Sequence, residues 1–359
     1  MRVIANILAA LSAALVLGAA PAGADVRIQG AGATFPNPLY QRWVSEYQKA
    51  HPDVKIDYQS IGSGGGIKAI TEKTVDFAGS DAPMNKKELE AAGGEAGIVE
   101  VPSCAGAVVP AYNLPGNPEL KFTGAVLAEI FAGKISVWSD AKITALNPGV
   151  TLPATAISPA WRTDGSGTTF VWTSYLATQS EAFKSTIGAG KQVRWPTGQG
   201  GKGNEGVAAA VQQTPGAIGY IELNYALANK IAFGAVRNTA GAFVKATPET
   251  VSAACDAAAT SLTGTILAAN LWNQPGANAY PIASFTYLIV HKDLGTVKTM
   301  DTVEKAKALA DFLWWSAHVG QQLTSELDYA PLSPGVTAKV EEALKTLTYK
   351  GTPVLSTGK

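Results

Sequence analysis

Cysteine and histidine are scarce in this chain of 359 residues, which contains two cysteines and three histidines. The histidines His51, His291 and His318 lie far apart and show none of the short spacings typical of zinc ligands. The sequence therefore predicts neither a disulfide-rich scaffold nor a metal site, and no cofactor is expected. Cys104 and Cys255 either form one disulfide, as an oxidising compartment would permit, or remain two buried thiols.

Neither sign of charge is in excess, because 28 lysines and arginines stand against 28 aspartates and glutamates. A chain without a strong overall field is not expected to bind nucleic acid or an anionic membrane surface. Any site for a small anion must therefore be built locally, from a few side chains and backbone groups.

Long apolar runs are confined to the N-terminus. Arg2 precedes a mostly apolar run over residues 3–17, and Ala22-Gly23-Ala24 forms a small-x-small cleavage site. The run is shorter than the roughly 20 residues that span a bilayer, which argues against a membrane anchor. The pattern is typical of a signal peptide over residues 1–24, cleaved after Ala24, and predicts release into the periplasm.

The rest of the chain alternates short β-type runs with amphipathic helical runs, as α/β proteins do, and its length suggests about two domains. The pattern predicts strands near residues 26–29, 54–58, 75–79, 107–113, 156–161, 217–222 and 285–290. Helices are expected near residues 37–50, 169–177, 203–213, 303–318 and 336–346, with a short helix following residues 62–66.

Three segments share one design, in which a strand leads through a glycine-rich turn with a hydroxyl residue into a helix. They are Gly32-Ala33-Thr34-Phe35, Gly62-Ser63-Gly64-Gly65 and Gly165-Ser166-Gly167-Thr168. Each helix start leaves backbone N–H groups without partners, and these donors together with the helix dipole favour an anion. Ordinary helix capping is the better explanation of any one turn taken alone, but three matched turns in one chain lead to the hypothesis of one shared anion site.

Two charged residues sharpen this hypothesis. Arg162 stands at the end of a predicted strand, where its guanidinium could bind two oxygens of a tetrahedral anion, and Asp164 could hold it in place. Asp81 follows another predicted strand and would face the same anion. A carboxylate suits phosphate, which keeps an acidic hydrogen near neutral pH, but not sulfate, which has none.

These motifs resemble those of the periplasmic phosphate-binding proteins of phosphate ABC importers. The likeness rests on Gly30-Ala31-Gly32-Ala33-Thr34-Phe35-Pro36, Ile61-Gly62-Ser63, Ser80-Asp81-Ala82-Pro83, Arg162 with Asp164-Gly165-Ser166-Gly167-Thr168, Gly200-Gly201-Lys202-Gly203-Asn204, Pro215-Gly216-Ala217-Ile218-Gly219-Tyr220 and Leu327-Asp328-Tyr329-Ala330. It covers essentially the whole chain after the signal peptide. Gly64 stands where some members have a second serine, and Asn238–Gln274 matches poorly.

The resemblance implies a type II periplasmic-binding-protein fold, with two α/β lobes, two crossing strands and the ligand in the cleft between them. It implies that residues 25–104 and 283–359 form lobe I and that residues 105–282 form lobe II. The implied phosphate contacts are Thr34, Phe35 through its backbone N–H, Ser63, Asp81, Arg162, Ser166, Gly167 and Thr168, with Asp164 supporting the arginine. The implied role is that of a monomeric, non-enzymatic receptor that delivers inorganic phosphate to membrane permease subunits.

Two alternatives remain open at this level. A secreted phosphatase on the same scaffold would need an activated nucleophile, and neither Ser63 nor Ser166 has a histidine nearby in the sequence. A receptor for another oxyanion is the second alternative, and Asp81 together with Arg162 argues against sulfate.

Overall fold

The computed structural model describes residues 25–258 and 261–355 of the chain. The predicted signal peptide and its cleavage site lie outside these residues. Strands and helices alternate as predicted, which gives a mixed α/β structure. In the described part of the chain, no helix is both long enough and apolar enough to cross a membrane.

The strands are β1 (Val26–Gly32), β2 (Val54–Ser60), β3 (Phe77–Ser80), β4 (Ile98–Tyr112), β5 (Lys121–Phe122), β6 (Ser158–Arg162), β7 (Gln199–Gly201), β8 (Ala217–Glu222), β9 (Ala232–Phe233), β10 (Ala235–Arg237), β11 (Phe243–Val244), β12 (Ala283–His291), β13 (Thr348–Tyr349) and β14 (Thr352–Pro353). The α-helices are α1 (Asn37–Ala50), α2 (Ser63–Thr71), α3 (Lys86–Ala91), α4 (Gly124–Phe131), α5 (Ala141–Leu146), α6 (Gly167–Gln179), α7 (Glu181–Thr186), α8 (Gly203–Gln213), α9 (Leu223–Ala228), α10 (Pro248–Ala258), α11 (Val303–Ala317) and α12 (Pro334–Leu344). Short 3-10 turns are η1 (Glu95–Gly97), η3 (Leu294–Thr296), η4 (Val319–Leu323) and η5 (Ser325–Leu327).

One mixed sheet runs through the molecule in the order β2-β1-β3-β12-β4-β8-β6-β7, with β9 also paired to β4. The pairs of β1 with β2 and with β3 are parallel, as are those of β6 with β7 and with β8. The central strand β4 pairs antiparallel with β12 on one side and with β8 on the other. Parallel strands end at the same edge, so the loops after β1 and β3 meet, as do those after β6 and β7.

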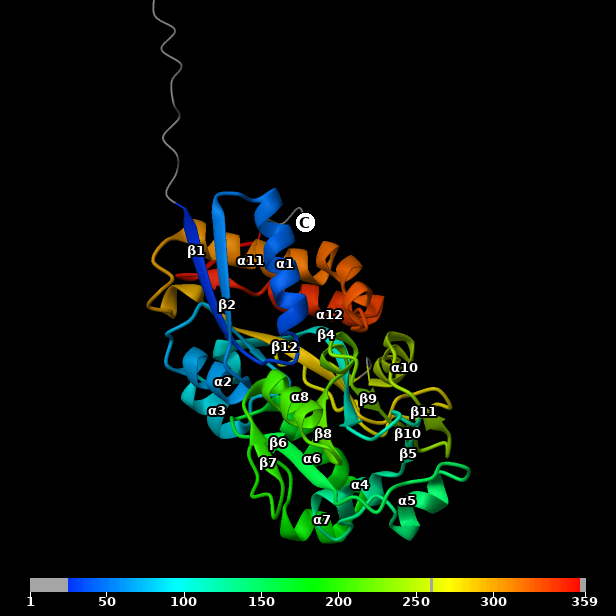
Figure 1. Cartoon of the computed structure of the whole chain (residues 1–359). Helices are drawn as coiled ribbons and strands as arrows, with labels where there is room; N and C mark the ends of the chain where they lie inside the picture. Colours follow the sequence, from blue (N-terminus) through cyan, green and yellow to red (C-terminus); the bar gives the residue numbers. More distant parts are fainter. Residues whose placement is uncertain (1–24, 259–260, 356–359) are drawn as a thin grey trace, which may run out of the picture.

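The sheet divides the molecule into two lobes that share β4 (Figure 1). Lobe I contains β1, β2, β3, β12 and the first part of β4, with helices α1, α2, α3, α11 and α12 around them. Lobe II contains the last part of β4 with β6, β7 and β8, and helices such as α6 and α8 pack on it. This architecture confirms the type II fold expected from the sequence.

Strand β4 joins the two lobes. All fifteen of its residues are buried. Its residues from Ile98 to Ala107 pair with β12, and those from Val108 to Tyr112 pair with β8. A strand buried on both faces needs a nearly continuous apolar sequence, which is what β4 has.

Candidate functional site

Arg162 is the last residue of β6, and its side chain is almost completely buried. Asp164 accepts two hydrogen bonds from the guanidinium, from Nε at 2.8 Å and from Nη2 at 2.5 Å. Partial burial alone would raise the pKa of Asp164, but the hydrogen bonds and the charge of Arg162 outweigh it and lower the pKa. The predicted supporting role of Asp164 thus has a direct geometric basis, because a two-point contact fixes the plane of the guanidinium.

The start of α6 lies beside this arginine. Ser166 caps the helix by accepting the N–H of Thr169 at 3.0 Å, which leaves the N–H groups of Gly167 and Thr168 without partners inside the helix. Arg162 Nη1 donates to Thr168 Oγ1 at 3.3 Å. The guanidinium and the helix N-terminus therefore present positive potential to the same space.

Asp81 follows β3 in lobe I and is also buried. Its carboxylate accepts hydrogen bonds from Thr286 Oγ1 at 2.9 Å and from Ser63 Oγ at 3.4 Å. Burial raises the pKa of Asp81 to about 7, although Thr286, Arg162 and Ser63 each act to lower it. Ser63 is the first residue of α2 and also accepts the Asp81 N–H at 3.2 Å.

Gly167 shows that these groups from the two lobes meet. A Cβ atom added to Gly167 would lie 2.5 Å from both Asp81 Oδ2 and Ser63 Oγ. The absence of a side chain therefore lets the start of α6 approach the two lobe I residues closely.

Thr34 and Phe35 lie between β1 and α1. The Thr34 hydroxyl oxygen accepts a hydrogen bond from Asn204 Nδ2 at 2.8 Å, and the Thr34 carbonyl oxygen accepts one from the Tyr225 hydroxyl at 2.6 Å. The Phe35 side chain is fully buried, and its carbonyl oxygen accepts the hydroxyl of Tyr329 at 2.7 Å. The side chain is thus packed in the interior, and the contact of a ligand with the Phe35 backbone N–H stays a prediction.

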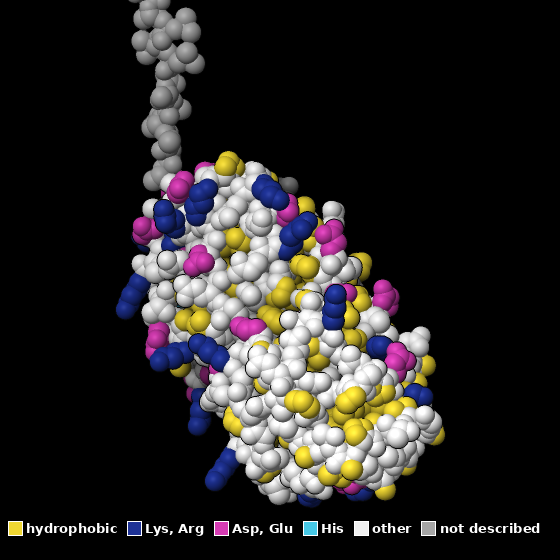
Figure 2. Space-filling view, viewed as in Figure 1, with side chains coloured by type: hydrophobic (Ala, Val, Ile, Leu, Met, Phe, Trp, Pro, Cys, Tyr) yellow, Lys and Arg dark blue, Asp and Glu magenta, His cyan; other side chains and the backbone are white. Residues whose placement is uncertain are grey.

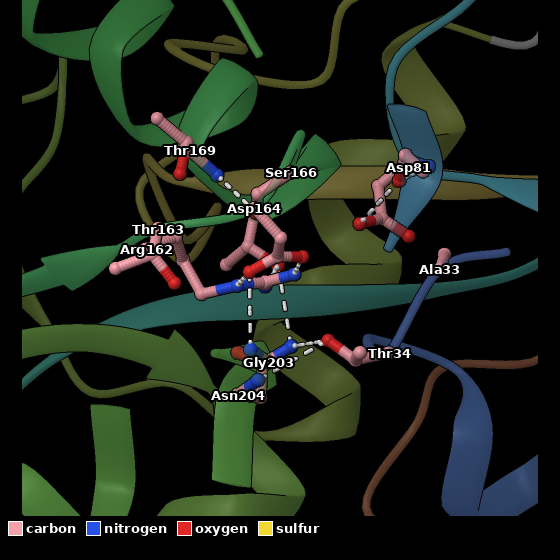
Figure 3. Close-up of polar contacts among 12 residues, drawn as sticks. Ala33, Thr34, Asp81, Arg162, Thr163, Asp164, Ser166, Thr169, Gly203 and Asn204 are labelled. Atoms are coloured by element: carbon pink, nitrogen blue, oxygen red, sulfur yellow. Dashed lines mark hydrogen bonds and ion pairs between the residues drawn. The ribbon is translucent and has the colours of Figure 1, made fainter. Parts of the chain in front are cut away.

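Figure 3 shows how the predicted residues face one another across the lobes. Thr34 and Asp81 stand on one side, and Arg162, Asp164 and Ser166 stand on the other. Three residues that the sequence analysis did not assign to the site join them: Asn204, Gly203 and Thr286. Asn204 and Gly203 could have been predicted from the sequence, since they belong to a glycine-rich motif at a helix start. Thr286 lies inside an apolar strand, and no sequence pattern marks it as a site residue.

The two cysteines decide between the alternatives that the sequence left open. Cys104 in β4 and Cys255 in α10 are both free and buried, so the structure has two buried thiols and not the disulfide. Burial raises the pKa of each thiol well above its ordinary value. Because the thiolate is the species that forms disulfides, this environment disfavours oxidation.

Basic and acidic side chains are interspersed on the face shown in Figure 2. In the described residues, no group of three or more histidine, cysteine, aspartate and glutamate side chains is arranged to hold a metal ion. The charges that define the candidate site are those of Arg162, Asp164 and Asp81.

Comparison with known proteins identifies the family. Residues 19–317 match the family model of the PBP superfamily domain. The phosphate-binding protein PstS of Pasteurella multocida is 44% identical over 322 residues, which cover 89% of this chain and 90% of that protein. The PstS protein of Methanocaldococcus jannaschii is 38% identical and covers 89% of this chain and 84% of its own length.

Solved structures agree on the fold. The phosphate-binding protein PfluDING, bound with phosphate, has a TM-score of 0.68 at 22% identity, covering 88% of this chain and 93% of its own. The phosphate-binding protein from Stenotrophomonas maltophilia has a TM-score of 0.67 at 20% identity, covering 89% and 95%. On the evidence of its family model and its curated relatives, this chain belongs to the PBP superfamily and, within it, to the PstS family of phosphate-binding proteins.

Proposed function

We propose that this chain binds one inorganic phosphate ion between its lobes and delivers it to a membrane ABC importer. The observation that carries the proposal is the meeting of Ser63 and Asp81 from lobe I with Arg162 and Gly167 from lobe II. The names of the relatives, which are phosphate-binding proteins, support the choice of ligand and a binding role instead of an enzymatic one.

The proposed contacts are Thr34, the Phe35 N–H, Ser63, Asp81, Arg162, Ser166, Gly167 and Thr168. Arg162 would bind two phosphate oxygens, and the N–H groups at the start of α6 would bind further oxygens. Asp81 would accept the phosphate proton when it is ionised. Sulfate has no proton to offer, so we propose that Asp81 discriminates against it.

Closure of the two lobes on the ligand is the proposed mechanism. Groups on both lobes would contact one phosphate ion, so the ion stabilises the closed arrangement by differential contact. Contacts between the lobes, such as Gly64 N–H to the Gly165 carbonyl oxygen at 2.8 Å, support a closed arrangement in this structure. We place the lobe boundaries at residues 25–104 and 283–359 for lobe I and at residues 105–282 for lobe II.

The proposed setting is the periplasm, reached through cleavage of the signal peptide after Ala24. The protein would act there as a monomer and dock in its closed form on the permease subunits of the importer. The sequence resemblance and membership of the family support this setting and this role.

Isothermal titration calorimetry with phosphate, arsenate and sulfate at pH 8 tests the proposal. We expect one phosphate per chain with a dissociation constant of micromolar or below, equivalent to about −8 kcal/mol or better. Arg162→Ala should weaken phosphate binding at least about tenfold, because it removes a charge-assisted contact. Binding of sulfate as tightly as phosphate would overturn the choice of ligand, and unchanged affinity in Arg162→Ala would overturn the proposed site.

A further inference from the structure

Asn204 is a buried amide at the start of α8, in contact with groups of both lobes. Its Oδ1 accepts the backbone N–H of Glu222 at 3.0 Å. A backbone N–H can only donate, so this contact fixes which end of the amide faces Glu222. The two hydrogens of Nδ2 must then point the other way, toward the candidate site.

Those hydrogens have two acceptors. Nδ2 donates to Thr34 Oγ1 of lobe I at 2.8 Å and to Thr168 Oγ1 of lobe II at 3.3 Å. The backbone N–H of Asn204 also donates to Thr34 Oγ1, at 3.2 Å. Figure 3 shows the contact with Thr34 crossing between the two sides of the site.

Each threonine hydroxyl thereby has its acceptor positions occupied. Thr34 Oγ1 accepts two hydrogen bonds from Asn204, and Thr168 Oγ1 accepts one from Asn204 and one from Arg162 Nη1. A hydroxyl group has two acceptor lone pairs and one hydrogen. Among the described residues neither hydroxyl has an acceptor for its hydrogen, so each is left able only to donate.

We propose that Asn204 is a positioning residue that fixes the hydroxyls of Thr34 and Thr168 as hydrogen-bond donors to the bound anion. This inference rests on the proposed function and deepens it. Phosphate oxygens on the Asn204 side of the site must be unprotonated, because every group there donates. The acidic hydrogen of the ligand is thus directed to Asp81, whose carboxylate can accept it.

A double-mutant cycle tests this role, with phosphate affinity measured by calorimetry at pH 8 for wild type, Asn204→Ala, Thr34→Val and the double variant. Asn204→Ala should weaken binding about tenfold or more, because each of the two hydroxyls loses one of the two hydrogen bonds that hold it as a donor to a charged ligand. In the Thr34→Val background the same change should cost at least about threefold less, because one of the two side-chain hydrogen bonds that it removes, and the shorter one, goes to the Thr34 hydroxyl.

Asn224→Ala is the matched control. The Asn224 side chain also bridges the lobes, from Nδ2 to the Leu327 carbonyl oxygen at 3.1 Å, but it contacts neither threonine. We expect it to change affinity less than about threefold and additively with Thr34→Val. A purely structural bridging role for Asn204 would make both asparagine variants behave alike.

If Asn204→Ala does not fold, Asn204→Asp replaces it in the cycle. The introduced carboxylate keeps an acceptor for the Glu222 N–H and has no side-chain donor at pH 8. The carboxylate repels phosphate equally in the wild-type and Thr34→Val backgrounds, so this repulsion cancels from the coupling free energy that the cycle measures. Additive effects of the Asn204 and Thr34 substitutions would overturn the role of Asn204 but not the proposed function of phosphate binding. Absence of phosphate binding by the wild type would overturn both the role of Asn204 and the proposed function.

Discussion

Asp81 combines deep burial with hydrogen-bond donors on its carboxylate, and this balance decides its protonation. Burial raises its pKa to about 7, and the hydroxyl of Thr286, the charge of Arg162 and the hydroxyl of Ser63 limit the increase. An aspartate that titrates near neutral pH can act as an acceptor above that pH and as a donor below it. The ligand it prefers should therefore depend on pH.

Sulfate competition against phosphate should increase as the pH falls. Below about pH 7 Asp81 carries a proton that it can donate to sulfate, whereas at pH 8.5 the ionised carboxylate repels it. We expect sulfate to compete at pH 5.5 and not at pH 8.5, measured by displacement calorimetry. Asp81→Asn, which has a neutral donor at both pH values, should bind sulfate at both.

Asp57→Asn is the control, because Asp57 is an exposed carboxylate on β2, and it should behave as wild type. A sulfate affinity that does not change between the two pH values in the wild type would rule out the proton-acceptor role of Asp81.

At the residue scale, the sequence predicted the groups with strong local chemistry. Arg162 with Asp164 two residues on, and Ser166 at a helix start, are short-range patterns that can be interpreted without a fold. Thr286 could not be predicted, because its contact with Asp81 joins residues 205 positions apart. Such pairs depend on the register of β3 against β12, which the sequence alone does not fix.

At the scale of elements, helix α2 is positioned by close backbone contact with β1. Gly66 lies in this helix, and a Cβ atom added there would stand 2.6 Å from Gly32 Cα and 2.8 Å from the Ala31 carbonyl oxygen. The glycine thus lets helix α2 pack closely against strand β1. This contact in turn positions Ser63, which lies one helical turn before Gly66. A side chain at this position would push the helix away.

Gly66→Ala should lower the free energy of unfolding by about 1–3 kcal/mol, since the backbone atoms it meets cannot rotate away. Urea denaturation of the ligand-free protein measures this. Gly335→Ala in α12 is the matched control, because a Cβ atom there meets nothing within 4 Å. The control should be neutral or more stable by up to about 1 kcal/mol, and equal effects at both positions would contradict the packing argument.

Helix α3 contributes an ion pair between the lobes. Lys191 Nζ of lobe II lies 2.6 Å from Glu88 Oε1 on α3, and both side chains are mostly buried. The Asn85 N–H at the start of α3 donates to the other carboxylate oxygen of Glu88 at 2.9 Å, which holds it in place. The pair exists only when the lobes are together and should stabilise the closed form.

Lys191→Ala should weaken phosphate binding about two- to fivefold at low salt, the range measured for single ion pairs, mainly through faster dissociation. The effect should shrink at high salt, which screens the pair in the wild type. Stopped-flow dissociation rates at two salt concentrations measure it. Lys184→Ala is the control, because it removes an exposed ion pair with Glu181 inside lobe II, and it should not change the dissociation rate. A dissociation rate of Lys191→Ala equal to that of the wild type would show that the Lys191–Glu88 ion pair does not stabilise the closed form.

Most elements could be predicted from hydrophobic periodicity, but two boundaries were wrong for physical reasons. The strand predicted at residues 107–113 is the last part of β4, which begins at Ile98. Its first part was missed because it contains Pro102, Cys104 and Gly106, which are not typical of strands. In addition, both faces of β4 are buried, so no alternation of polar and apolar residues marks it as a strand. The predicted turn at residues 62–66 is mostly the first turn of α2, since the glycines there serve packing and not reversal of the chain.

At the scale of the whole molecule, buried carboxyl groups gather near the strands that join the lobes. Asp81 follows β3, Glu100 lies in β4, and Glu222 ends β8. Burial raises the pKa of Glu100 to about 8 and that of Glu222 well above its ordinary value. The folded chain therefore keeps protons on Glu100 and Glu222 near neutral pH, and on Asp81 in part.

The unfolded chain releases these protons near pH 4, where exposed carboxyl groups titrate. Between about pH 5 and 7 the folded state consequently binds more protons than the unfolded state, so the free energy of unfolding must fall as the pH rises. His291 opposes this trend, because burial lowers its pKa and the unfolded chain takes up the proton first. Three carboxyl groups outweigh one histidine, and stability should decrease from pH 5.5 to pH 8.

Glu222→Gln isolates one contribution to this slope. The neutral amide keeps an oxygen to accept the Asn224 N–H, which donates to Glu222 Oε2 at 2.8 Å in the wild type, and it never ionises. We expect the decrease in unfolding free energy between pH 5.5 and 8 to be smaller by about 1–3 kcal/mol, measured by urea denaturation without phosphate. Glu181→Gln at an exposed glutamate should keep the wild-type slope. If Glu222→Gln also keeps the wild-type dependence of the unfolding free energy on pH, Glu222 is ionised in the folded state. A cationic or hydrogen-bond-donating group must then stabilise its charge where the lobes join.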